Sequence, residues 1–321
     1  MMTNLNIEMI KDAHKRIRHY IRKTPLIHSE VFSELCSGNV YMKLENLQLT
    51  NSFKIRGALN RMSLLSAEEK VHGVITASSG NHAQGVALAA KHLNISAKIV
   101  IPKNISKIKL DKIRQYDVTI LQEGKYDEME TRAKDLSKRE HIQYISPYND
   151  LEVIAGQGTV GLEIFEDVSN INSILVPVGG GGLISGIAMV AKTLDPNIEI
   201  IGVQTKGAST MYESWKAGKV VNFKEFQTVA EGLSGGLDPQ AITLDLINKY
   251  VDRIVLVEEE NVEKAIRILW KKEGQTVEGA GATVIAYLLE EEEKFARKNV
   301  VAVISGGNIE YSLLNRLLGE I

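Results

Sequence analysis

The stretch Val176-Pro177-Val178-Gly179-Gly180-Gly181-Gly182-Leu183-Ile184-Ser185-Gly186 decides the fold of this chain. Its branched apolar residues predict the end of a buried strand, the four glycines predict a tight loop, and the apolar residues after them predict a helix. Backbone N–H groups without side chains at a helix start form a positive cradle that suits a phosphate. A tight turn alone explains one or two glycines, but hardly four in a row. The stretch therefore predicts a strand, a phosphate-binding loop and a helix of an α/β fold.

The glycine spacing differs from that of the nucleotide-binding loops. The third residue after Gly182 is Ser185 and not glycine, and the next expected strand leads to Gln204 where a dinucleotide site has an acidic ribose ligand. Neither Gly-Lys pair of the chain completes a nucleotide P-loop. A single small phosphate is therefore the better ligand.

Short apolar, β-branched runs alternate with longer helical patterns along the whole chain. The expected strands cover residues 40–44, 73–77, 97–101, 118–121, 142–145, 173–178, 199–203, 253–257 and 300–304. The expected helices between them include residues 84–93, 107–116, 126–139 and 261–273. This alternation predicts parallel sheets covered by helices on both faces, with ligands at the carboxyl ends of the strands.

Composition narrows the function classes. The chain has 321 residues, which suits two domains, and acidic and basic residues are mixed at a net charge of −2. Neither a basic footprint for nucleic acid nor an apolar run long enough to span a membrane is present in the sequence. The N-terminus lacks the pattern of a secretory signal, and Cys36 is the single cysteine, expected to pack in the core. We therefore expect a cytoplasmic protein with a small-molecule substrate and neither nucleic acid nor membrane as a partner.

Two further segments indicate which phosphate compound binds. Ser52-Phe53-Lys54-Ile55-Arg56-Gly57-Ala58 carries a lysine whose amine could hold the aldehyde of pyridoxal 5'-phosphate. Ser78-Ser79-Gly80-Asn81-His82-Ala83-Gln84 follows an expected strand and opens a helix, where hydroxyls and N–H groups suit the carboxylate of an amino acid. Alone, Lys54 is typical of a solvated charge and the Ser/Asn loop of a helix cap. Together with the glycine loop they predict a site for pyridoxal phosphate and an amino acid.

Five segments in the same order resemble the serine/threonine dehydratase and serine racemase family. They cover residues 52–58, 78–85, 153–159, 177–183 and 305–308, and so span nearly the whole chain. The resemblance implies the tryptophan synthase beta-like arrangement, fold type II, of pyridoxal-phosphate enzymes. It implies two three-layer α/β domains with parallel sheets: a large cofactor-binding domain of residues 1–50 and 150–321, and a small mobile domain of residues 51–149.

The resemblance also implies a role for each site residue. Lys54 would hold the cofactor and take the α-proton as a neutral amine, with Phe53 near the ring, Asn81 at the ring hydroxyl and Ser305 at the pyridine nitrogen. The implied cofactor contacts are Phe53, Lys54, Asn81, Gly179, Gly180, Gly181, Gly182, Leu183 and Ser305. The implied substrate contacts are Ser78, Ser79, Gly80, Asn81, His82 and Tyr148. The implied catalytic residues are Lys54 and Ser79.

These roles predict an ammonia-lyase. A hydroxyl at the pyridine nitrogen cannot hold a full positive charge there, so the ring is a weaker electron sink and expulsion of a β-leaving group competes well. We expect water to be eliminated from a β-hydroxy amino acid such as L-threonine or L-serine, giving a 2-oxo acid and ammonia.

Other activities remain open at particular residues. Ser79 stands where racemases carry the serine that serves the opposite face of the α-carbon, whereas Tyr148 matches the dehydratase pattern. His82-Ala83-Gln84 argues against a β-replacing synthase, and intact Lys54 and Ser305 argue against a non-catalytic protein. His82 could act as a general base or brace the loop.

Departures from the family pattern lead to further expectations. Gln204 and Thr210 stand where relatives place two anionic ligands of a divalent cation, so we expect weak cation binding or none, and the histidines lack metal-ligand spacing. Ala230-Glu231-Gly232 and residues 233–239 depart from the family near the substrate pocket and leave the exact substrate open. The resemblance further implies a homo-oligomer, a dimer or a tetramer.

Overall fold

The computed structural model describes residues 5–124 and 128–319, and its strands form two sheets. The larger sheet has six strands in the order β1-β2-β10-β7-β8-β9, and the smaller has four in the order β5-β4-β3-β6. The strands of the larger sheet are β1 (Leu26–Ser29), β2 (Asn39–Leu44), β7 (Ser173–Pro177), β8 (Glu199–Thr205), β9 (Arg253–Val257) and β10 (Asn299–Ile304). Those of the smaller sheet are β3 (Val74–Ala77), β4 (Ala97–Ile101), β5 (Thr119–Gln122) and β6 (Gln143–Tyr144).

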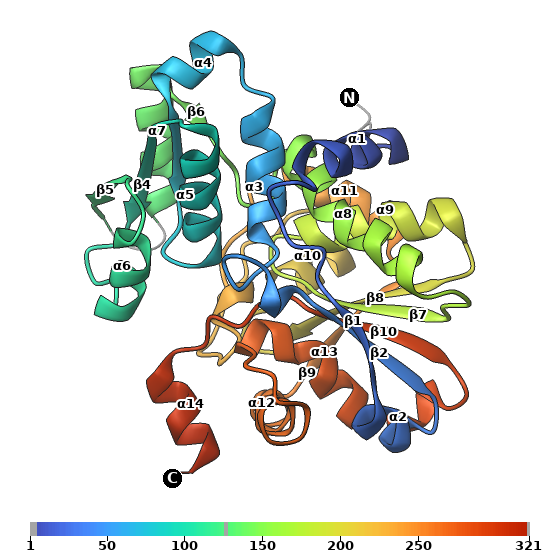
Figure 1. The fold of residues 1–321 in the computed structure, drawn as a ribbon. Coiled ribbons are helices and arrows are strands. Elements are labelled where there is room, and N and C mark those ends of the chain that lie inside the picture. The colour runs from blue at the N-terminus through green and yellow to red at the C-terminus, as the bar shows by residue number, and fades with distance from the viewer. Residues whose placement is uncertain (1–4, 125–127, 320–321) are drawn as a thin grey trace.

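Helices cover both faces of the larger sheet, with α8, α9 and α11 on one side and α2, α12 and α13 on the other (Figure 1). The helices around the smaller sheet and the amino terminus are α1 (Ile7–Ile17), α2 (Glu30–Cys36), η1 (Glu45–Leu47), α3 (Lys54–Ser63), α4 (Ala67–His72), α5 (Asn81–Leu93), α6 (Lys107–Arg114) and α7 (Met129–Glu140). Those of the remaining chain are α8 (Leu151–Asp167), α9 (Gly182–Leu194), α10 (Thr210–Ala217), η3 (Glu231–Leu233), α11 (Ile242–Tyr250), α12 (Glu259–Glu273), α13 (Gly279–Glu290), η4 (Glu292–Phe295) and α14 (Tyr311–Leu318). The α/β class predicted from the alternating pattern is confirmed.

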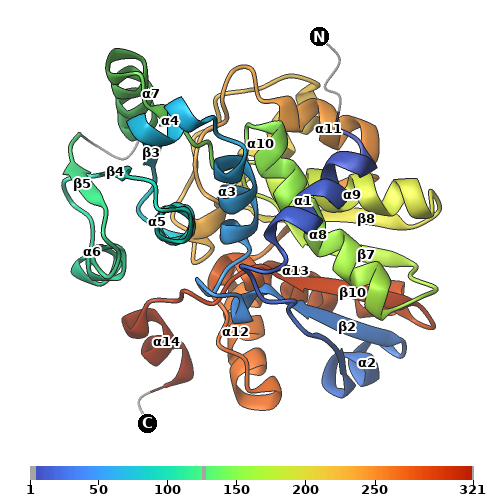
Figure 2. The same ribbon diagram turned by 45° about the horizontal axis from the view of Figure 1, so that its top comes forward.

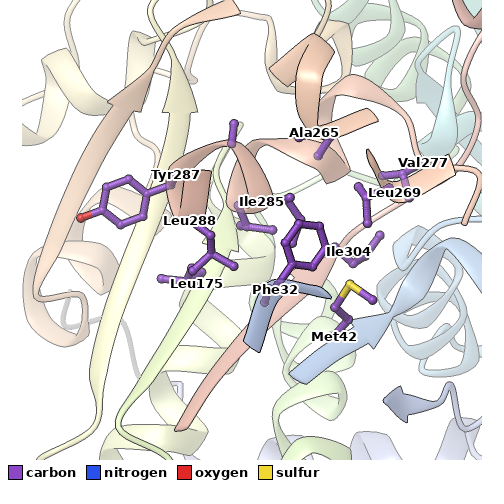
Figure 3. Close-up of a cluster of buried hydrophobic side chains, with 14 of the residues drawn as sticks. Phe32, Met42, Leu175, Ala265, Leu269, Val277, Ile285, Tyr287, Leu288 and Ile304 are labelled. Atoms are coloured by element: carbon purple, nitrogen blue, oxygen red, sulfur yellow. The ribbon is translucent and has the colours of Figure 1, made fainter. Parts of the chain in front are cut away.

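The central strands carry the core. All five residues of β7 are buried, because helices cover both faces of this strand, and such strands read as continuous apolar runs. On the α12–α13 side, Phe32, Met42 and Leu175 pack against Ile285 and Leu288 (Figure 3). Cys36 joins this cluster at the end of α2, and burial raises the pKa of its thiol to about 11. The cysteine is therefore a core residue, as expected, and not a nucleophile.

Strand β1 was not predicted from the sequence, and it runs antiparallel to its neighbour β2. β1 pairs antiparallel with β2 at the edge of the sheet, whereas the other strand pairs of both sheets are parallel. Its four residues include the exposed His28, so no continuous apolar run marked it. The helix expected from residue 84 begins three residues earlier at Asn81, and the predicted start of α7 at Tyr126 lies outside the described residues.

Helix α3, which begins at Lys54, lies between α5 and α8 (Figure 2). Glycines let α3, α8 and α9 approach closely: a Cβ on Gly156 would lie 2.6 Å from the Arg56 carbonyl oxygen, and one on Gly186 would lie 2.6 Å from the Gly158 nitrogen. Larger side chains would push the helices apart. The glycines therefore hold the segment that carries Lys54 against α8 and, through α8, against α9.

A cluster of four buried charges anchors the first turn of α3. The Arg56 guanidinium donates to Glu45 at 2.8 Å and to Glu163 at 2.6 Å, and Lys43 donates to Glu163 at 2.7 Å. None of these side chains is more than 1% exposed. Because two cations face two carboxylates, each charge is compensated. The cluster joins α3 to η1, β2 and α8.

No helix in residues 5–124 and 128–319 combines the length and the apolar character needed to cross a bilayer.

Candidate active site

Lys54 is a partly buried amine at the start of α3. Its Nζ donates to the Pro147 carbonyl oxygen at 3.0 Å and lies 5.0 Å from the centre of the Phe53 ring. Burial lowers the pKa of Lys54 to about 8, against the opposing pull of the Glu278 carboxylate. A larger fraction of this amine is neutral near neutral pH than for an ordinary lysine, which a nucleophile or a base requires.

The glycine loop follows β7 as predicted. Gly181 has a φ of +85° and precedes α9, and no side chain caps this helix. The N–H groups of the first turn therefore face the loop without a side-chain acceptor. A Cβ on Gly180 would lie 2.4 Å from the Tyr148 ring, and one on Gly179 would lie 3.2 Å from the Leu233 backbone. The loop fits the phosphate of pyridoxal phosphate, because its amides are free and close neighbours leave no room for side chains.

The Ser/Gly/Asn loop forms a second uncapped helix start. Gly80 precedes α5, whose first turn lacks a side-chain cap, so the helix-cap interpretation does not describe this loop. The Ser78 hydroxyl accepts from the Gly80 N–H at 3.2 Å, and a Cβ on Gly80 would find no atom within 4 Å. Ser79 lies in the same half-buried loop. Free N–H groups beside open space suit a carboxylate.

Asn81 is held by Glu278, which the sequence analysis missed, and by Asn308, which lies in the family segment 305–308 without an assigned role. Its Nδ2 donates to Glu278 at 2.7 Å, and its Oδ1 accepts from Asn308 at 2.8 Å. Burial raises the pKa of Glu278. Because an amide nitrogen carries two hydrogens, one N–H of Asn81 remains for a ligand. Glu278 stands before a helix, where acidic residues are common, so its sequence position carried no distinguishing signal.

His82 is a neutral, buried side chain. Its Nε2 contacts the Ile145 carbonyl oxygen at 3.0 Å, and burial, together with the Lys54 charge, lowers the pKa of His82 to about 3. An imidazole next to a carbonyl donates its N–H, which leaves Nδ1 as an acceptor. This contact fits the bracing role, because it ties the start of α5 to the end of β6.

The remaining predicted site residues lie along one path of contacts. Ser305 follows β10, and its carbonyl oxygen accepts from the Phe53 N–H at 3.2 Å. Tyr148 packs on Gly180, and its hydroxyl accepts from the Asp238 N–H at 2.7 Å. Since Pro147 contacts Lys54, the contacts run from the glycine loop through residues 147–148 to Lys54 and Ser305.

Gln204 and Thr210, which stand where relatives place cation ligands, form hydrogen bonds with other residues of the chain. Gln204 donates from Nε2 to the Ala208 carbonyl at 3.0 Å and accepts from the Tyr212 N–H at 2.7 Å. Thr210 donates to Glu225 at 2.6 Å. Across residues 5–124 and 128–319, no group of three or more His, Cys, Asp or Glu side chains could hold a metal ion.

Comparisons with known proteins agree with this geometry. Residues 17–306 match the family described as "Pyridoxal-phosphate dependent enzyme". The chain is 41% identical over 317 residues to the L-threonine ammonia-lyase of Thermotoga maritima, covering 98% of this chain and 79% of that protein. It is 42% identical to a catabolic L-threonine dehydratase of Staphylococcus aureus, covering 97% and 90%. The structure of maize serine racemase matches with a TM-score of 0.91 at 34% identity, covering 97% of this chain and 96% of that one. The chain therefore belongs to the pyridoxal-phosphate-dependent enzymes of fold type II, in the group of threonine ammonia-lyases and serine racemases.

Proposed function

We propose that this enzyme is an ammonia-lyase that eliminates water from L-threonine or L-serine and releases a 2-oxo acid and ammonia. One observation carries the proposal: a lysine amine of lowered pKa is connected by contacts to the uncapped helix start at the glycine loop, and α5, whose start is also uncapped, packs at Gly85 on the Lys54 backbone. Relatives about 41% identical over nearly the whole chain, named threonine ammonia-lyase or dehydratase, support this reaction.

Each residue of the proposed cofactor site has a role that follows from its chemistry. Bound pyridoxal phosphate supplies an electron sink for the pair left at the α-carbon. Residues 179–183 would hold its phosphate through backbone N–H groups, the remaining N–H of Asn81 would bind its ring oxygen, and Ser305 would bond to its pyridine nitrogen. Phe53, whose ring centre lies 5.0 Å from the Lys54 Nζ, would pack beside the cofactor ring.

Lys54 would anchor the cofactor and take the α-proton. Its lowered pKa makes the neutral form accessible near pH 8. The N–H groups at the start of α5, with Ser78, Ser79 and Gly80, bind the substrate carboxylate. His82 braces this loop through its contact with the Ile145 carbonyl oxygen, and the Tyr148 ring packs on Gly180 of the glycine loop.

Racemisation is the second candidate, because Ser79 lies in the half-buried loop and maize serine racemase is a close structural neighbour. A hydroxyl on the face opposite Lys54 could exchange a proton with the α-carbon.

We also propose that residues 51–149 move as a unit, that the protein is a homo-oligomer, and that it works in the cytoplasm. The separate four-stranded sheet supports the first point, the family resemblance the second, and the single buried thiol of Cys36 the third. Sedimentation velocity of the purified protein tests the second.

The test of the function measures 2-oxo acid and ammonia from cofactor-loaded enzyme with L-threonine, L-serine and their D-isomers. We expect both products from an L-isomer and no turnover by Lys54→Ala. Ser79→Ala should remove any racemisation and keep elimination of the L-isomer, with weaker substrate binding because Ser79 lies in the loop proposed to hold the carboxylate. Formation of D-serine without a 2-oxo acid would establish the racemase instead. Turnover by Lys54→Ala would refute the assignment of the base.

A further inference from the structure

Residues 145–150 carry the chain from the smaller sheet back to α8, and this crossing segment touches two parts of the site. The Pro147 carbonyl oxygen accepts from Lys54, and the Tyr148 ring lies against Gly180. The ring is close enough that a Cβ on Gly180 would lie 2.4 Å from it. The position of this segment therefore affects both the amine and the glycine loop.

The loop of residues 234–242 holds the crossing segment by three hydrogen bonds. The Asp238 N–H donates to the Tyr148 hydroxyl at 2.7 Å. Asn149 accepts from the Ile242 N–H at 2.9 Å and donates to the Gln240 carbonyl oxygen at 3.3 Å. Tyr148 thus owes its place on the glycine loop partly to Asp238.

The side chain of Asp238 reaches in a different direction, to the smaller sheet. Its carboxylate accepts from Lys134 on α7 at 2.6 Å. Helix α7 packs on this sheet through Met129, Ala133 and Leu136. One residue therefore contacts α7 through its carboxylate and the tyrosine on the glycine loop through its N–H.

We propose that Asp238 is a positioning residue for the glycine loop. Its ion pair with Lys134 couples the packing of α7 to the position of the Tyr148 ring on Gly180, and this coupling slows the loss of bound cofactor. The inference rests on the proposed role of the glycine loop in holding the phosphate. When α7 is docked, the ion pair holds one Asp238 oxygen while the Gln240 N–H donates to the other at 2.9 Å, the Asp238 N–H holds the tyrosine, and the ring supports Gly180. When the pair opens, Asp238 and the tyrosine gain freedom and the cradle loosens.

The exposure of the pair suits a contact that opens and closes. The Lys134 and Asp238 side chains are 36% and 18% exposed. Ion pairs at such sites contribute modestly and are screened by salt, so this pair can break without unfolding the protein. A fully buried pair would cost far more to separate.

A second contact across the same two parts of the chain offers a matched control. Glu310 accepts from Ser106 at 3.2 Å and lies 3.7 Å from Lys109 on α6. It thus joins the smaller sheet's helices to the segment before α14, but neither Tyr148 nor the glycine loop is among its hydrogen-bond or ion-pair partners. Glu310→Gln removes the charge of this second contact and leaves Asp238, Lys134 and Tyr148 unchanged.

The experiment follows the release of pyridoxal phosphate from diluted holoenzyme by its absorbance. We expect Asp238→Asn, Lys134→Gln and Tyr148→Phe each to accelerate release roughly two- to five-fold, in the range of a half-exposed ion pair or one hydrogen bond. The double variant Asp238→Asn/Lys134→Gln should release cofactor no faster than the faster single variant. Rising salt should accelerate release from the wild type but not from Asp238→Asn, and Glu310→Gln should match the wild type.

Unchanged release in Asp238→Asn, additive effects in the double variant, or equal acceleration in Glu310→Gln would each overturn the proposal. Gly181→Ala separates this failure from failure of the glycine loop's role, because Gly181 has a φ of +85° and the atoms nearest to its Cβ would belong to Ile247, Met211 and Thr243 and not to Tyr148. If the loop holds the phosphate, Gly181→Ala weakens cofactor binding whatever Asp238 does. Normal cofactor affinity in Gly181→Ala would overturn the proposed role of the loop itself.

Discussion

Replacing Lys54 with methionine should destroy function and stabilise the cofactor-free protein. Burial lowers the pKa of Lys54 from 10.5 to about 8. The unfolded chain therefore binds this proton more tightly than the folded one, and the resulting destabilisation of the fold is fully present below about pH 8. A difference of about 2.5 pKa units corresponds to roughly 3 kcal/mol at pH 7. As pH rises from 8 toward 10.5 the penalty disappears, so by pH 9.5 roughly 1 kcal/mol remains.

Urea unfolding of the cofactor-free wild type and Lys54→Met at pH 7 and pH 9.5 measures this penalty. Cys36 and the tyrosines titrate in both proteins and cancel in the difference, which contains the Lys54 amine and its interactions with Glu278 and His82. We expect the variant to be more stable by roughly 3 kcal/mol at pH 7 and by roughly 1 kcal/mol at pH 9.5. A variant no more stable than the wild type at pH 7, or a gap that widens with pH, would refute a desolvated amine.

Two further predictions concern the fold and the cation positions. Gly186→Ala should lower the free energy of unfolding by about 1–3 kcal/mol, because its Cβ would lie 2.6 Å from Gly158 on α8. Gly236→Ala is the control, because no atom lies within 4 Å of the Cβ that it would add. Equal losses of stability in urea unfolding of the two variants would contradict this packing argument. A chelator should leave the rate of 2-oxo acid formation unchanged, because Gln204 and Thr210 carry no charge and already bond to Ala208 and Glu225. A strong loss of this rate that Mg²⁺ or Ca²⁺ restores would show that a cation site exists.

The parts of the fold predicted from the sequence are those with a strong local signal. The buried strands β7 and β10 read as continuous apolar runs, and the glycines after β7 occupy a loop with little room for side chains. The family resemblance, the α/β class and the cofactor are confirmed by the family match and the relatives. The edge strand β1 escaped, because four residues with an exposed histidine carry no clear period.

The site residues could be predicted where a short sequence motif carries both the loop and the reactive group. They could not be predicted where residues far apart in the sequence come into contact. Glu278 and Asn308 reach Asn81 across 197 and 227 residues of chain, so only the fold could bring them together. The pairing of Asp238 with Lys134 across 104 residues escaped for the same reason. The residue-by-residue roles at Lys54, Ser79, Asn81 and Ser305 remain predictions for the experiments above.

The four buried charges behind α3 bear on how this sequence can diverge. Replacing Arg56 alone would leave Glu45 and Glu163 facing each other with only Lys43 as a counter-charge, and loss of one partner from such a pair typically costs about 3–5 kcal/mol. Since this is a large share of a domain's stability, single replacements at any of the four positions should be eliminated by selection. The four residues can then drift only as a group, through compensated double changes or exchange for an apolar set. An engineer who moves α3 with its lysine into another scaffold must carry Lys43, Glu45 and Glu163 along with Arg56.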